Sequence, residues 1–157
     1  MLEITHALVA GTIATHSKDP ATAITLSFLS HFLLDAVPHW DFGTHWRKRR
    51  KLYTGIVAIL DVIAGFILGY LLFGSVVPFP ILFLCITASM LPDWMEAPWY
   101  IFFASPDKKE PSKNAGIFEK ITFNIYRMEN VFHHKTGFPL GAITQVVVVG
   151  FFYFLLR

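Results

Sequence analysis

Residues 30–41 read S-H-F-L-L-D-A-V-P-H-W-D, an apolar segment that closes with polar groups. Its four clustered ionisable side chains are His31, Asp35, His39 and Asp41. Residues 21–37 are predicted to form a helix, in which His31 and Asp35, four positions apart, lie on the same face. Pro38 ends that helix, because the residue before a proline is driven out of the helical conformation. His39 and Asp41 can therefore fold back toward the helix face, and the stretch predicts one His/Asp/His/Asp cluster.

The composition of the whole chain predicts a membrane protein. Of its 157 residues, 54% are hydrophobic, and the mean hydropathy is +0.52. Residues 53–73 are interrupted only by Asp61, and a helix of that length crosses a hydrocarbon layer of roughly 30 Å. Residues 21–37, 76–91 and 139–156 are shorter candidates. Because backbone groups facing lipid must be satisfied within their own segment, we expect an all-α, polytopic helical membrane protein of one domain with four to five membrane-embedded helices.

Two further segments are predicted to be helical without crossing the membrane. Residues 2–16 form a short helix with His6 near its start. Residues 117–134 alternate apolar with basic side chains in the manner of an amphipathic helix that lies in the lipid interface. This helix closes with a polar group of residues: Glu129, Asn130, His133 and His134. Adjacent histidines cannot both face one point, and His133 is the ligand that we favour.

The basic residues predict the orientation of the chain. Residues 47–51 read R-K-R-R-K, and by the positive-inside rule this loop is cytoplasmic. With that assignment, 11 of the 13 Lys and Arg residues lie inside, so we expect an inner-membrane protein whose site faces the cytoplasm. The formal charge of +2 is too small to indicate a nucleic-acid partner. Gly65 and Gly69 indicate close helix packing, either within the bundle or in a homodimer.

The predicted topology brings ten ionisable side chains to the cytoplasmic side. They are His6, His31, Asp35, His39, Asp41, Asp93, Glu96, Glu129, His133 and His134. Imidazoles and carboxylates are the ligands of Zn²⁺ and similar divalent ions in sites that keep a position open for water. We therefore predict one to three ions, with Zn²⁺ as first choice. The predicted metal ligands are His6, His31, Asp35, His39, Asp93 and His133. Asp41 and Glu96 are predicted to orient or deprotonate a water molecule, as catalytic groups.

Other interpretations of the same residues stay open. A lone histidine is more often an interfacial side chain bonded to the backbone, and His31 with Asp35 can form a buried ion pair between helices. The metal could serve only as a structural clip. Asp61 lies in the middle of its predicted span, about half a membrane from the cluster, where ionisable groups are usually functional. A hydrogen bond to another helix is its first interpretation, and a small ion transporter using Asp61 is the alternative.

Three motifs carry a resemblance to a known family. T-H-A-L-V-A-G at residues 5–11, S-H-F-L-L-D at residues 30–35 and L-P-D-W-M-E at residues 91–96 resemble the YdjM-like family of small inner-membrane metal-dependent hydrolases. That family is similar in its motifs to zinc-dependent phospholipase C and the S1/P1 nucleases, all-α enzymes with His and Asp ligands. The resemblance implies a hydrolase for a phosphoester in a lipid or lipid-linked substrate. It marks as metal ligands His6, His31, Asp35 and Asp93. H-H-K-T-G at residues 133–137 departs from the family's H-R-G-x-T-H segment.

Overall fold

The computed structural model describes residues 1–45 and 48–155, and every regular element in them is a helix. In chain order the elements are α1 (Glu3–His16), α2 (Pro20–Asp35), α3 (Lys51–Phe73), α4 (Phe79–Pro98), the π-helix η2 (Trp99–Phe103), α5 (Ile117–Phe132) and α6 (Leu140–Leu155). The prediction of an all-α fold is confirmed. Arg47 of the predicted basic loop and Arg157 at the end of the chain lie outside the described residues.

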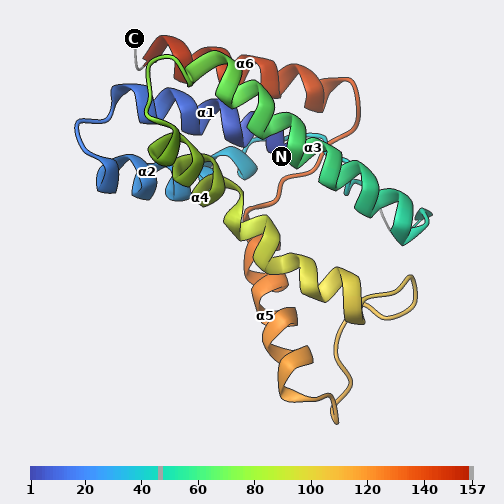
Figure 1. The fold of residues 1–157 in the computed structure, drawn as a ribbon. Coiled ribbons are helices and arrows are strands. Elements are labelled where there is room, and N and C mark those ends of the chain that lie inside the picture. The colour runs from blue at the N-terminus through green and yellow to red at the C-terminus, as the bar shows by residue number, and fades with distance from the viewer. Residues whose placement is uncertain (46–47, 156–157) are drawn as a thin grey trace.

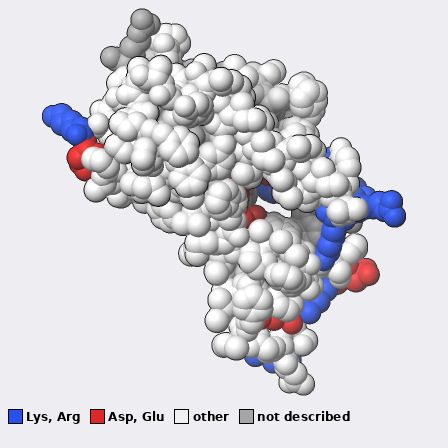
Figure 2. Space-filling model, viewed as in Figure 1, with Lys and Arg blue, Asp and Glu red and all other residues white. Residues whose placement is uncertain are grey.

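The helices form a bundle from which a helical arm projects (Figure 1). α1 is the central helix of the bundle and packs against α2, α3, α4 and α6. Its Ala7, Val9 and Ala10 are fully buried. The end of α4 continues into η2, which pairs with α5 to make the arm. In the space-filling view, the bundle surface is mostly uncharged, while acidic and basic atoms appear in a hollow between the bundle and the arm and along the arm (Figure 2).

Local sequence explains how α2 begins and ends. Asp19 caps the helix, because its carboxylate accepts a hydrogen bond of 2.9 Å from the Thr22 N–H, and Pro20 occupies the first turn. The helix ends at Asp35, two residues before the predicted boundary. Pro38 thus follows the end of α2 as expected, and the chain turns back toward the helix face.

The second proline-containing boundary was predicted wrongly. The apolar segment at residues 76–91 was expected to end before Pro92, but α4 starts at Phe79 and continues through Pro92 to Pro98. A proline inside a helix removes one backbone N–H and loosens the preceding turn. In that turn the Ser89 carbonyl oxygen accepts a hydrogen bond of 2.8 Å from Nδ1 of His31. α4 therefore carries Asp93 and Glu96 on a continuous helix into the arm.

By length and composition, one helix in the described residues is long and apolar enough to cross a membrane. This helix is α3, with 23 residues and a mean hydropathy of 2.5 in its most apolar window. α6 is also apolar but has only 16 residues. The expected four to five membrane-embedded helices are therefore not supported by helix length. Gly65 of α3 faces the bundle, since a Cβ there would lie 3.1 Å from the Glu3 carbonyl oxygen. This position agrees with the within-bundle interpretation of the glycine pair.

Asp61 of α3 caps the first turn of α1. Its carboxylate accepts hydrogen bonds from the backbone N–H groups of Glu3, at 2.8 Å, and Ile4, at 3.4 Å. A carboxylate at a helix N-terminus satisfies amides that have no partner within the helix and meets the positive end of the helix dipole. Glu3 lies three residues before His6, so Asp61 lies close to the cluster, and the prediction that about half a membrane separates them was wrong. The reason is that the first ten residues of α3 extend beyond the bundle (Figure 1). Its interpretation as a hydrogen-bond partner of another helix is correct.

Gln145 of α6 holds the same turn of α1 from the other side. Its Oε1 accepts hydrogen bonds from the Leu2 N–H, at 2.9 Å, and from the Thr5 hydroxyl, at 3.0 Å. Its Nε2 donates to the Trp40 carbonyl oxygen at 2.7 Å. This one amide therefore connects the start of α1 with the loop that follows α2, and both segments carry predicted site residues.

Candidate metal centre

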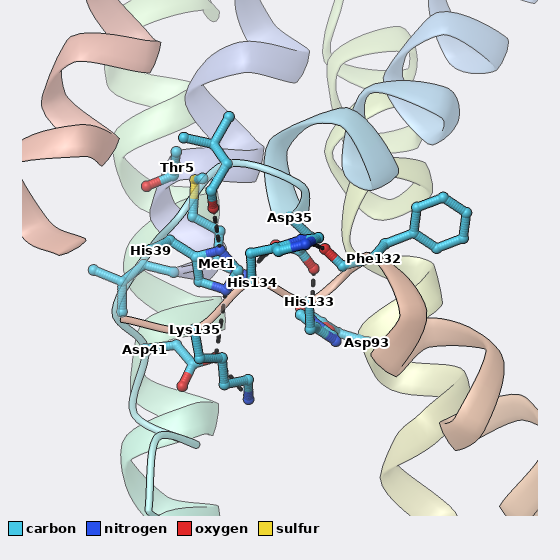
Figure 3. A network of polar contacts seen from close by, with 12 residues as sticks. Met1, Thr5, Asp35, His39, Asp41, Asp93, Phe132, His133, His134 and Lys135 are labelled. Carbon is cyan, nitrogen blue, oxygen red and sulfur yellow. Dashed lines mark hydrogen bonds and ion pairs between the residues drawn. The ribbon is translucent and has the colours of Figure 1, made fainter. Parts of the chain in front are cut away.

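The predicted ligands come from five separate segments and meet in one buried cluster. Figure 3 shows four of them, Asp35, His39, Asp93 and His133. His6 belongs to the second turn of α1, His31 and Asp35 to the last turns of α2, and Asp93 to α4. His39 lies in the loop after α2, and His133 follows the last residue of α5. The side chains of His6, His31 and His39 have no exposed surface, and that of Asp35 is 1% exposed. The cluster is thus enclosed by the packing of the helices.

Backbone pairing of two distant segments places His133 in the cluster. The His134 N–H donates to the Asp35 carbonyl oxygen at 3.0 Å, and the His39 N–H donates to the His134 carbonyl oxygen at 2.9 Å. An isolated parallel bridge joins His39 and Lys135. The ring of His134 is exposed, and its Nδ1 lies 3.0 Å from the Phe132 carbonyl oxygen. Of the two adjacent histidines, the structure therefore brings His133 to the predicted ligands.

Asp35 is the centre of the cluster. Its carboxylate oxygens lie 3.4 Å from Nε2 of His6, 3.3 Å from Nε2 of His31 and 2.6 Å from Nε2 of His133. In a tetrahedral zinc site with bonds of about 2.0–2.1 Å, neighbouring ligand atoms lie about 3.3 Å apart. The spacings of Asp35 to His6 and His31 therefore suit side chains that share an ion, whereas His133 is hydrogen-bonded directly to Asp35.

Three groups of side chains have ligand atoms within 4.8 Å of one another, and the groups overlap. They are His6, His31, Asp35 and Asp93; Asp35, His39 and His133; and Asp93, Glu96 and His133. Each group shares a carboxylate or an imidazole with another. Because a carboxylate has two oxygens, Asp35 and Asp93 can each serve two neighbouring positions. The arrangement is compatible with the one to three ions that the sequence predicts.

The rings of His31 and His39 are oriented as metal ligands are. Nδ1 of His31 lies 2.8 Å from the Ser89 carbonyl oxygen, and Nδ1 of His39 lies 2.8 Å from the Val37 carbonyl oxygen. A carbonyl oxygen only accepts hydrogen bonds, so Nδ1 carries the proton and Nε2 presents a lone pair to the cluster. Within the described part of the chain, Nε2 of His6, His31 and His39 has no hydrogen-bond partner. Burying such atoms unpaired costs free energy, and a divalent ion would satisfy them.

The two predicted catalytic carboxylates occupy different places. Oδ2 of Asp41 lies 3.8 Å from Nε2 of His39 and 3.0 Å from Nζ of Lys135, so Asp41 borders the cluster. The Lys135 charge outweighs the effect of burial and lowers the pKa of Asp41. Glu96 is buried and lies with Asp93 and His133, where it can act either as a ligand or as a base. The roles of both carboxylates stay predictions.

Two cationic groups in or beside the cluster were missed in the sequence. The Met1 amino group is buried and forms an ion pair with Asp35 (Figure 3). Lys135 lies two residues after His133, and this spacing was the available signal for its position. Glu129, noted in the sequence but given no role, lies with Oε2 3.9 Å from Nε2 of His31. The excess of carboxylates around these groups leaves the centre suited to cations.

His39 and His133 differ in their protonation. Burial, together with the nearby amino terminus, lowers the pKa of His39 to about 4. Burial also disfavours the charged form of His133, but hydrogen bonds and charges from Asp35 and Asp93 outweigh it and raise the pKa of His133 to about 10. Without a metal, His39 is neutral near pH 7 and His133 is protonated. A metal that binds His133 must therefore displace a proton.

Comparison with known proteins found no match, so the function is interpreted from the geometry of the site. No protein-family model matches the chain, and no curated protein or solved structure matches it. The chemistry that the site can perform is accordingly inferred from its own side chains. Their nitrogen and oxygen donors, deep burial and overlapping groups could hold a metal ion.

The close approach of α6 to the loop after α2 gives a test of how the centre is held. A Cβ at Gly141 would press on the Trp40 backbone nitrogen and lie 2.7 Å from the His39 carbonyl carbon. Gly141→Ala must therefore displace the backbone that carries His39. We expect the substitution to lower the free energy of unfolding by about 1–3 kcal/mol. We also expect the variant to bind zinc more weakly. Thermal unfolding in detergent, with and without Zn²⁺, measures both effects.

Gly150→Ala is the matched control for that substitution. Gly150 lies in the same helix, and a Cβ there would have no neighbour within 4 Å. Its alanine variant should be as stable as the parent or slightly more stable, because alanine favours helix. Equal behaviour of the two variants would contradict the proposed contact between α6 and the His39 loop.

Proposed function

We propose that the protein is a membrane-bound, metal-dependent hydrolase that acts on a phosphoester of a lipid or lipid-linked substrate at the cytoplasmic face. The observation that carries this proposal is the convergence of buried imidazole Nε2 atoms and carboxylates in three overlapping groups. Zn²⁺ is the preferred ion for such donors. The motifs that resemble the YdjM-like family favour the same class of reaction.

The chain's own groups can account for the proton transfers of such a reaction. The chemistry that a bound divalent ion supplies is activation of water near neutral pH and neutralisation of charge on phosphoryl oxygens. Asp41 or Glu96 would accept a proton from the attacking water as its oxygen bonds to phosphorus. The bond from phosphorus to the ester oxygen breaks, and the departing oxygen takes up the proton. Lys135, 3.0 Å from Asp41, lowers the pKa of that carboxylate and keeps it ionised near neutral pH.

The apolar surface supports a membrane location. Residues 51–60 contain no buried side chain, although most of them are apolar, and large exposed patches of this kind are unusual in water. In our proposal α3 crosses the membrane, the shorter bundle helices are embedded to part of its depth, and α5 lies in the interface with Ile117, Phe118 and Ile121 exposed. The basic residues at the start of α3 would then lie in the cytoplasm.

This placement implies sideways entry of the substrate. Asp61 lies ten residues along α3 from Lys51, which corresponds to about 15 Å of helix. Since Asp61 caps the turn of α1 that precedes His6, the metal centre would lie below the level of the basic loop. A lipid phosphoester would reach it through the hollow between the bundle and the arm (Figure 2).

The proposed reaction can be tested with purified protein in detergent or vesicles. The assay measures zinc-dependent release of phosphate or head group from a panel of phospholipids and lipid-linked phosphates. Asp35→Ala and Asp93→Ala should each lower the rate more than about 100-fold, since even groups that only support ligands cost 10–100-fold. His16→Ala is the control, because His16 is exposed at the far end of α1. If hydrolysis persists at the parent rate in both aspartate variants, the measured activity comes from a contaminating enzyme.

A structural metal clip is the second candidate, and the low exposure of the cluster favours it. A clip fills each coordination position with protein groups, whereas a hydrolytic site keeps one for water. X-ray absorption of the zinc-loaded protein distinguishes the two, because exogenous azide changes the zinc spectrum only where a position is exchangeable. An unchanged spectrum together with inactive protein would support the clip.

A further inference from the structure

A second site lies next to the metal centre, between the loop after α2 and the arm. It is a pocket of about 320 Å³. Besides Gly43, its lining side chains are His45, Lys48, Tyr100, Tyr126, Asn130 and Lys135. This volume falls in the range of small-molecule sites, and the polar groups come from three separate segments of the chain.

The pocket carries positive charge. Lys48 and Lys135 line it, and none of its described lining residues is acidic. Lys135 is held in position by Asp41, at 3.0 Å, and its side chain is only 28% exposed. The pocket can therefore present two ammonium groups, the Asn130 amide and two tyrosine rings to one ligand. Ammonium and amide N–H groups are donors that suit a group with several anionic oxygens.

Side-chain contacts join the residues of the arm that line the pocket. The rings of Tyr100 and Tyr126 meet edge to face with centroids 5.1 Å apart, which ties η2 to α5. Asn130 Nδ2 donates to the Tyr126 carbonyl oxygen at 2.9 Å. His45 has a positive φ of 60°, a left-handed conformation that is uncommon for a residue with a side chain.

Asp41 separates this pocket from the metal centre. Its Oδ2 lies between Nζ of Lys135 and Nε2 of His39, at 3.0 and 3.8 Å. Figure 3 shows Asp41 and Lys135 together, below His39. Only the Asp41 carboxylate would therefore lie between a phosphate in the pocket and the predicted metal ligand His39.

We propose that this pocket binds the phosphate group of the substrate and positions it beside the metal centre. The inference rests on the proposed function for the identity of the reaction, but the anion site itself is defined by Lys48, Lys135 and Asn130. A lipid head group and a free phosphate share the required chemistry. The protein would thus select substrates whose phosphate oxygens reach the two ammonium groups while the ester bond faces the metal ligands.

Calorimetric titration of metal-free protein in a neutral detergent tests the pocket independently of catalysis. Inorganic phosphate is one probe and a short-chain phosphatidic acid is the other. Lys48→Gln and Lys135→Gln should each weaken binding of phosphate roughly tenfold or more, since each removes a charge-assisted hydrogen bond. Arg50→Gln is the matched control, because it removes the same charge close by in sequence but does not line the pocket. It should change phosphate affinity less than about twofold.

The outcomes separate this inference from the proposed function. Binding that depends on Lys48 but not on Arg50, in a protein without hydrolytic activity, would support the pocket and contradict the hydrolase. No phosphate binding to the metal-free protein, or equal loss of binding in its Lys48 and Arg50 variants, would overturn the pocket. If the same protein is active once loaded with zinc, the hydrolase stays intact. Tighter binding of phosphatidic acid than of inorganic phosphate, with the same dependence on Lys48, would support the pocket and identify a lipid as the source. Equal affinity would support it with free phosphate as the source.

Discussion

Replacement of Asp35 by asparagine is expected to remove nearly all bound zinc. The Asp35 carboxylate lies within 3.8 Å of Nε2 of four histidines and belongs to two of the three candidate metal groups. Asparagine keeps the shape of the side chain but loses the negative charge that attracts a cation. Protein purified without chelator should fall from at least one zinc per chain to less than about a tenth, because a neutral amide is a poor zinc ligand. Elemental analysis by mass spectrometry measures this stoichiometry directly.

The control for that experiment is His16→Ala. His16 is exposed at the end of α1, with Nδ1 2.9 Å from the Thr12 carbonyl oxygen, and should have no effect on the bound zinc. Circular dichroism shows whether the Asp35 variant remains helical, since the Met1 amino group loses its ionic partner there. A folded Asp35→Asn protein with full zinc content would contradict the assignment of Asp35 to the centre. Absence of zinc from the parent protein, with none taken up on titration, would contradict the centre as a whole.

Zinc affinity is expected to rise at least about tenfold for each pH unit, or at least about 100-fold from pH 6 to pH 8. Burial raises the pKa of Glu96 to about 8, so Glu96 would steepen the dependence if it also binds the ion. In the metal-free protein the pKa of His133 is raised to about 10, so this imidazole carries a proton throughout that range. Zinc binds only the neutral imidazole, and lowering the proton concentration therefore favours the metal. The pKa of His39 is about 4, so His39 is already neutral and adds nothing to the slope. Chelator competition at several pH values gives the affinity.

A change at His133 itself provides the comparison for the pH dependence. His133→Ala should bind zinc more weakly and with a shallower slope, because the displaced proton is gone. Calorimetry in two buffers with different ionisation enthalpies should detect at least one proton released per zinc bound in the parent protein and fewer in the variant. Equal affinity of the parent protein at pH 6 and pH 8 would contradict the role of His133 as a ligand.

Local spacing was enough to predict the parts of the structure that depend on neighbouring residues. The four-residue interval between His31 and Asp35 places them on one face of α2, and the rigid backbone at Pro38 allows His39 to turn back toward them. The length and apolar composition of α3 were equally visible. In each case a short-range rule of helix geometry decides the outcome, so no knowledge of the tertiary contacts was required.

Features that depend on how distant segments pack were not predictable in this way. The choice between His133 and His134 follows from backbone pairing of residues 134–136 with Asp35 and His39. Asp61 lies beside the cluster because α3 begins outside the bundle. The length of a helix does not predict how far it is shifted along its axis relative to its neighbours. Pro92 was read as a helix end, but packing of α4 against its neighbours retains the helix through it. Tertiary contacts of this kind override local preference.

The hydrogen bonds from the start of α1 to Asp61 and Gln145 also have a consequence for synthesis of the protein. α1 is synthesised before α3 and α6, yet the amides at the start of α1 find their partners on those two helices. The hydrogen bonds at the start of α1 can therefore all form only after residue 145 has been translated. His31 and Asp35, by contrast, share one face of α2 as soon as that helix forms. In the proposed metal centre, the full set of ligands would thus come together only after α6 has been synthesised.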